Sequence, residues 1–369
     1  MKLYIKIPCL SFIILGSLFI NSCNKPEGSV EKNNPSNPTT VAEDKAFITN
    51  ITNNTNLCIK AARDGNLSQS IIQFLNLSNG TAGNQDWADS MQTELENVMG
   101  FLELDPNNSK FNYPAYWGTY NWNRVTKKFS KTAAVGIYVN FPSTPAQLTN
   151  NVALKFPEYT DGLYQANAKN IYLPKTAKAT LTKDNVVIAD LNFLANYSNG
   201  SFPIPLNIAY TIILAPHTYT FNVQEVTTTQ FKFSSTIFSG GGCGITINAT
   251  ISFINDDYNN FVLENDLKTV DANYQSGDFI VKSVWDAKTY FLFNNPTTLN
   301  LNSTLSSNVY NKTDKIAELK FQDVAGSREM FIFYKDGTSE NTSVYYDPFT
   351  TNLKNLLRPI FGNDVDTWF

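Results

Sequence analysis

The stretch Ile245-Thr-Ile-Asn-Ala-Thr-Ile-Ser-Phe253 alternates apolar and polar residues through nine positions. Successive side chains of a strand point to opposite faces, so this pattern predicts a strand with one buried face and one polar face. The same alternation occurs over residues 135–141 and again over residues 219–223. One-sided burial of this kind is typical of antiparallel sheets.

Short turn signals separate these runs. Lys183-Asp184-Asn185 and Lys335-Asp336-Gly337 each lie between strand-like segments and predict tight hairpins. The glycine-rich run Ser239–Gly244 lacks the spacing of a phosphate-binding loop and precedes a strand rather than a helix, so it predicts another hairpin or a wide turn. The sequence lacks the strand-helix-strand rhythm that would indicate a parallel sheet. Residues 111–369 are therefore predicted to form a large, mainly antiparallel β-rich region.

The preceding residues, 44–110, have a helical period. A first helix would end at Asp64-Gly65, and a second is expected around Ile71, Ile72 and Leu75. The clearest helix carries an apolar stripe that we interpret as a core-facing surface, made of Trp87, Met91, Leu95, Val98 and Leu102. A short C-terminal helix is expected near Phe349 and Leu353, closed by Pro359. The fold class predicted is α+β, with a half-barrel or a sandwich as possible forms of the sheet.

The N-terminus has the features of a secretory signal. Lys2 and Lys6 precede an uncharged apolar stretch, residues 7–20, which is too short to cross a bilayer. We assign residues 1–22 to a signal peptide and residues 23–43, which are rich in Asn, Pro, Ser and Thr, to a disordered tether. A soluble exported protein is the alternative to a membrane-attached one.

Ile20-Asn21-Ser22-Cys23 resembles the lipobox of bacterial lipoproteins, although Asn21 stands where a small residue is usual. The resemblance implies that Cys23 carries the lipid anchor, including palmitate, and that the membrane is a partner of the chain. Two or three buried acyl chains hold a protein far more firmly than one.

Composition excludes one class of partner. The net charge is −4, and we found no basic cluster of the kind that a nucleic-acid surface needs. Cys58 and Cys243 remain after the expected processing. We expect two free thiols, with a disulfide as the alternative that export would permit.

Three stretches resemble uncharacterised lipoproteins of Bacteroidota-type bacteria: Gly118–Asn123, Leu173–Leu191 and Lys335–Gly337. That family has no established activity. The resemblance implies a cell-envelope location, and Asn24 after the cysteine fits the outer membrane, on either its periplasmic or its surface face. Asp89-Ser90-Met91 resembles the O-glycosylation acceptor of such bacteria, which makes Ser90 a possible glycosylation site; a plain helix-surface serine is the alternative.

Catalytic and metal motifs are weak. His217 is the only histidine, no GxSxG elbow is present, and the cysteines are scattered, so we expect no catalytic residue, metal or cofactor. Acidic residues near two aromatic ones, Asp256, Asp257, Glu264 and Asp266, could serve a glycan hydrolase or could be a solvated surface.

Three functions follow from these observations. We expect a cell-envelope lipoprotein with a non-enzymatic binding or structural role. A carrier of lipid or another apolar ligand in a half-barrel is the first alternative, and a carboxylate-dependent glycan hydrolase is the second. A filled core would favour the first function, an aromatic-lined cavity would favour the carrier, and facing acids in a cleft would favour the hydrolase.

Overall fold

The computed structural model describes residues 40–78, 82–105, 107–166, 169–198, 203–239, 243–293 and 296–361. It has an α+β fold, in which helices precede a large, mainly antiparallel sheet of sixteen strands and a further helix follows it, as the sequence predicts. The chain divides into two compact units. One comprises residues 61–225 and 258–260, and the other comprises residues 1–60, 226–257 and 261–369.

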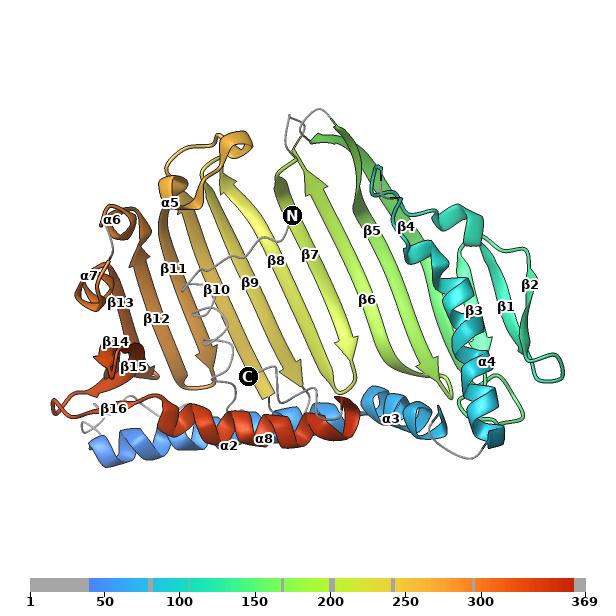
Figure 1. Ribbon diagram of the computed structural model, residues 1–369, viewed down its shortest axis with the longest axis horizontal. Coiled ribbons are helices and arrows are strands. Elements are labelled where there is room, and N and C mark those ends of the chain that lie inside the picture. The colour runs from blue at the N-terminus through green and yellow to red at the C-terminus, as the bar shows by residue number, and fades with distance from the viewer. Residues whose placement is uncertain are drawn as a thin grey trace, which may run out of the picture. The chain divides into compact units, whose positions relative to one another are not determined.

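In the unit of residues 61–225, the strands lie side by side in the order β8-β7-β6-β5-β4-β3-β1-β2 (Figure 1). Strands that follow one another in sequence are neighbours, except that β1 lies between β2 and β3. Its elements are α3 (Asn66–Ser78), α4 (Ala82–Met99), η1 (Gly100–Leu102), η2 (Tyr113–Tyr116), β1 (Gly118–Asn123), β2 (Lys128–Thr132), β3 (Ile137–Phe141), β4 (Val152–Ala166), β5 (Lys169–Lys183), β6 (Val186–Tyr197), β7 (Pro205–Leu214) and β8 (His217–Thr227). The sheet is antiparallel except between β1 and β3, which run parallel.

The other unit has strands in the order β16-β15-β14-β13-β12-β11-β10-β9, all of them antiparallel. Its elements are most of α2 (Val41–Asp64), β9 (Gln230–Ser239), β10 (Cys243–Phe253), α5 (Leu263–Asp266), β11 (Leu267–Ser276), β12 (Phe279–Asp286), α6 (Ala287–Phe291), α7 (Thr298–Thr304), β13 (Leu305–Asn311), β14 (Asp314–Val324), β15 (Ser327–Tyr334), β16 (Ser339–Asn341) and α8 (Ser343–Phe361); η3 (Tyr258–Asn260) falls in the first unit. Among the described residues, the strands of each unit form one continuous series of paired neighbours, so neither unit shows the second sheet that a sandwich needs.

The alternation seen in the sequence sets which faces are buried. Ile137 and Val139 of β3 are fully buried and pack with Val98 of α4. In the other unit, Ile245 of β10 packs with Ile48 and Ile51 of α2. Burial of such a side chain contributes about 1.5–3 kcal/mol, which makes these faces the main source of stability.

Ion pairs fix helix α2 in its unit. Asp44 is 1% exposed, and its carboxylate lies 3.1 Å from Nζ of Lys335, in the β15–β16 turn. Lys45 lies 2.7 Å from the carboxylate of Glu340 in β16. The same carboxylate accepts hydrogen bonds from the hydroxyls of Tyr334 and Tyr345, so four elements meet at one partly buried polar group.

Most predicted turns and helices are confirmed. Asp184 and Asn185 both have positive φ between β5 and β6, as a two-residue hairpin turn requires. Gly337 has φ of +85° before β16, and Ser239 pairs with Cys243 as a hairpin at the glycine run requires.

Two details of the sequence prediction were wrong. Pro359 does not end the C-terminal helix, because α8 continues to Phe361. Leu102 does not continue the buried stripe of α4; it lies in η1, where the helical period has changed, and is 50% exposed.

Candidate apolar binding site

A row of apolar side chains crosses four neighbouring strands. Tyr159 of β4 pairs with Ala177 of β5, which pairs with Phe193 of β6, which in turn pairs with Tyr210 of β7. Residues directly opposite each other in a sheet share a face, so the four side chains form one band.

A second band runs beside the first on the same face. Ala179, Leu191 and Ile212 pair across β5, β6 and β7, and each lies two residues from a member of the first band. Strand β5 gives only alanines to both bands, where its neighbours give Phe, Leu, Tyr and Ile. The small side chains leave a hollow over β5.

Aromatic side chains wall this hollow. The ring of Phe101 in η1 lies 5.0 Å from that of Phe156, and the ring of Tyr113 lies 5.7 Å from that of Tyr159, both in edge-to-face contact. The hydroxyl of Tyr113 donates to the carbonyl oxygen of Phe156, which fixes η2 against β4. These ring contacts tie η1 and η2 to strand β4 beside the hollow.

The volume of this hollow, which opens to solvent, is about 290 Å³. Its lining residues are Phe101, Leu102, Phe111, Tyr113, Phe156, Glu158, Tyr159, Pro174, Ala177, Lys178, Ala179, Leu191, Phe193, Tyr210 and Ile212. Only two of them are charged, and these two pair with each other: Nζ of Lys178 lies 2.7 Å from the carboxylate of Glu158. We call this cavity the apolar pocket.

Two tyrosines of the pocket, Tyr113 and Tyr159, stay neutral near pH 7. Burial raises the pKa of Tyr113 to about 12, with smaller contributions from Tyr138 and Glu158. Burial also raises the pKa of Tyr159 above its usual range. The hydrogen bond from Lys178 lowers the pKa of Glu158, so this carboxylate stays ionised beside the Lys178 side chain near pH 7. The pocket therefore favours an uncharged, apolar occupant.

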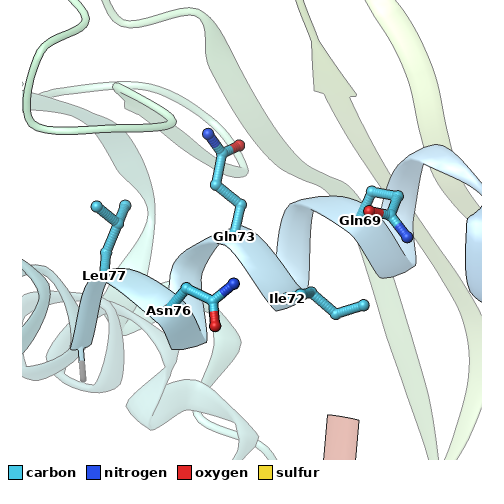
Figure 2. Close-up of a pocket in the computed structure, with 5 residues that line it drawn as sticks. All are labelled: Gln69, Ile72, Gln73, Asn76 and Leu77. Atoms are coloured by element: carbon cyan, nitrogen blue, oxygen red, sulfur yellow. The ribbon is translucent and has the colours of Figure 1, made fainter. Parts of the chain in front are cut away.

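A second pocket, of about 300 Å³, lies along helix α3. Figure 2 shows its five described lining residues, all from that helix: Gln69, Ile72, Gln73, Asn76 and Leu77. Three of the five carry amides, and no described residue of another element closes over them. The apolar pocket has walls from several elements and is the better candidate site.

The residues weighed for catalysis do not form a site. His217 is buried at the start of β8, with its ring 6.2 Å from that of Tyr219. Asp266 accepts hydrogen bonds from the Val262 amide at 2.7 Å and from the Asn255 side chain at 2.9 Å, so it holds the turn before β11. Among the described residues, no group of three or more His, Cys, Asp or Glu side chains could hold a metal ion.

The predicted modification sites have different outcomes. Cys23 lies outside the described residues. Ser90 lies on α4, and its hydroxyl donates to the Asp86 carbonyl at 2.7 Å. The expectation of a free thiol at Cys58 was wrong, since Cys58 is buried and disulfide-bonded. Sequence spacing could not show this, because a disulfide depends on the approach of two distant segments.

No family model matches the sequence, and no curated protein or solved structure shows significant similarity to it. None of the described helices has the length and hydropathy needed to cross a membrane.

The apolar pocket was not found from the sequence. A signal for it exists in β5, where Ala177 and Ala179 stand between Thr176, Lys178 and Thr180. Alanines in place of bulky residues on an alternating strand indicate either close packing or a hollow. Only the register with β4 and β6 decides between the two.

Proposed function

We propose that this chain is a lipid-anchored, non-enzymatic binding protein of the bacterial cell envelope, and that the apolar pocket takes an apolar molecule. The observation that carries the proposal is an aromatic-walled cavity whose two charged lining residues neutralise each other. Dry cavities lined by hydrocarbon bind apolar guests readily, because no polar group has to lose water.

The size of the pocket restricts the occupant. Its volume of about 290 Å³ is at the lower end of the range of ligand pockets, which is about 300–1,000 Å³. A single hydrocarbon chain or a small ring system fits this volume better than a lipid with several chains. The proposal therefore favours the carrier alternative over a purely structural role.

The acids near residues 256–266 give the hydrolase alternative no support. Asp256 and Asp257 are exposed, and Asp266 is occupied by the turn that it stabilises. A glycosidase needs two carboxyl groups that face each other across a bond. The location at the envelope, and the outer membrane in particular, rests on the signal-like N-terminus, Cys23 and Asn24.

A fluorescent fatty acid, cis-parinaric acid, tests the proposal. The probe is titrated into protein made without residues 1–22 and with Cys23→Ala, so that no attached lipid competes. Ala177→Trp fills the hollow over β5 and is expected to weaken probe binding at least tenfold.

Ala209→Trp is the matched control. Ala209 lies next to Tyr210 in β7 and so faces the opposite side of the sheet. This variant is expected to bind the probe within twofold of the unmodified protein. Equal binding by both variants, or no binding by the unmodified protein, would refute the proposal. Thermal melting of each variant verifies that it is folded.

A further inference from the structure

Positive charge gathers in one part of the chain although the whole protein is acidic. No acidic residue occurs between Asp105 and Glu158, whereas six basic residues do: Lys110, Arg124, Lys127, Lys128, Lys131 and Lys155. The net charge of the protein is −4. The expectation that Lys and Arg form no cluster therefore fails for this segment, which covers strands β1 to β3.

Three of these cations lie at the turn between β1 and β2. The side-chain oxygen of Asn123 accepts hydrogen bonds from the backbone amides of Val125 at 2.9 Å and Thr126 at 3.1 Å. Such a turn fixes the backbone without help from packing. It holds Val125 in solvent with 92% of its surface exposed, between Arg124 and Lys127.

The β3–β4 loop lies beside this turn. The Arg124 guanidinium donates to the Pro145 carbonyl oxygen at 3.0 Å, and the Asn150 amide donates to the Trp122 carbonyl oxygen at 3.4 Å. Leu148, between the two loop residues, is 79% exposed. We call the two loops together, residues 124–128 and 145–150, the basic tip.

Two carboxylates accept hydrogen bonds from residues that adjoin the basic tip. Glu94 of α4 accepts a hydrogen bond from the Phe129 amide at 2.9 Å. Asp184 accepts one from the Asn151 side chain at 2.9 Å, and Lys183 precedes it in the chain. Neither forms an ion pair with Arg124, Lys127 or Lys128 among the described residues.

We propose that the basic tip docks on an anionic lipid surface, with its cations at the phosphates and with Val125 and Leu148 in the interface. Basic residues beside exposed aliphatic side chains are the combination that binds membrane surfaces. A stable protein interface usually involves about 20–30 residues on each side, whereas the basic tip has only the eleven residues 124–128 and 145–150. This proposal does not depend on the apolar pocket.

Vesicle sedimentation tests the proposal with the mature chain carrying Cys23→Ala, so that its own lipid cannot hold it. Vesicles of phosphatidylcholine are compared with vesicles that also contain phosphatidylglycerol. We expect binding to the anionic vesicles at least tenfold tighter than to the neutral ones, and weaker at high salt because ions screen exposed charges.

Three variants locate the contact. Lys127→Glu/Lys128→Glu should weaken binding to anionic vesicles at least tenfold, and Val125→Ser/Leu148→Ser should weaken it severalfold. Lys268→Glu/Lys288→Glu, in the other unit, makes the same change in net charge at two exposed positions and should bind within twofold of the parent.

Equal loss in both charge variants would mean that net charge, and not the basic tip, attracts the protein, and it would overturn the proposal. Absence of binding to anionic vesicles would also overturn it and would leave an acidic protein as the partner of the tip. Neither result bears on the fatty-acid titration, so the two proposals fail separately.

Discussion

Tyr210 and Phe221 stack face to face across β7 and β8, with ring centroids 5.0 Å apart and an interplanar angle of 17°. They are direct cross-strand partners. The pocket-wall rings meet differently, as Phe101 and Phe156 do at 69°. The stack continues the first band of the apolar pocket onto β8, yet only Tyr210 lines the cavity.

Substitutions in this pair can distinguish an effect on protein stability from an effect on ligand binding. Tyr210→Leu and Phe221→Leu each remove the stack, so each should lower the free energy of unfolding by about 0.5–1.5 kcal/mol beyond the area lost. Only Tyr210→Leu should weaken cis-parinaric acid binding, by about three- to tenfold on the affinity scale. Urea unfolding and probe titration measure the two effects. Equal weakening of binding in both variants would show that the floor of the site extends to Phe221.

Helix α4 provides a test of packing. Met91 is fully buried with Trp87 and Trp122, so Met91→Ala should cost about 2–5 kcal/mol in the free energy of unfolding. Leu95 is only partly buried, and Leu95→Ala should cost less. Urea denaturation of both variants verifies the order. If Leu95→Ala were the more destabilising, the helix would face the sheet at a different angle.

The stripe on α4 also shows what local sequence can predict. Trp87, Met91 and Val98 recur at helical spacing, and that spacing alone places them on one buried face. Strands β3 and β10 were predictable for the same reason, at period two. Such patterns say which face is buried, but they do not say what lies against it.

The disulfide at Cys58 gives a prediction about its partner. Cys9 and Cys23 belong to the signal-like N-terminus, so Cys243 is the remaining cysteine in the sequence. We expect Cys58 to resist alkylation in the unreduced protein and to react once Cys243 is replaced by serine. Loss of the bond should lower stability by roughly 2–4 kcal/mol. Alkylation of Cys58 in the unreduced parent, read by peptide mass spectrometry, would contradict this.

Sites assembled from distant segments could not be predicted from the sequence. The apolar pocket needs the register of β4 to β7 and the walls that Phe101, Phe111 and Tyr113 contribute. The basic tip needs the hydrogen bond from Arg124 to Pro145, which joins residues 21 positions apart in two different loops. Its charge bias could have been counted in the sequence, whereas the exposure of Val125 and Leu148 could not.

Glu318 makes stability depend on pH. Hydrogen bonds from Lys315 and Lys320, at 2.6 Å and 2.5 Å, lower its pKa to about 2. A carboxyl group whose pKa is lowered by folding stabilises the folded state above its unfolded pKa, and this contribution is lost as pH falls through about 2. Glu318→Gln should therefore be less stable than the parent at pH 7, and the difference should shrink as the pH falls from about 4.5 toward 2. Urea midpoints at several pH values measure it, and a constant difference would contradict the linkage.

The membrane anchor is the last prediction, and it concerns the N-terminus. If residues 1–22 are removed and Cys23 is acylated, a clickable palmitate analogue should label the protein in cells. Cys23→Ala should abolish the label and move the protein to the soluble fraction, because two or three acyl chains give far firmer attachment than the basic tip alone. Lys127→Glu/Lys128→Glu on the Cys23 background is the control, and it should remain labelled and membrane-bound. Equal labelling of the parent and Cys23→Ala would refute the anchor. Unlabelled Cys23→Ala that stayed on membranes would mean that the basic tip holds the chain by itself.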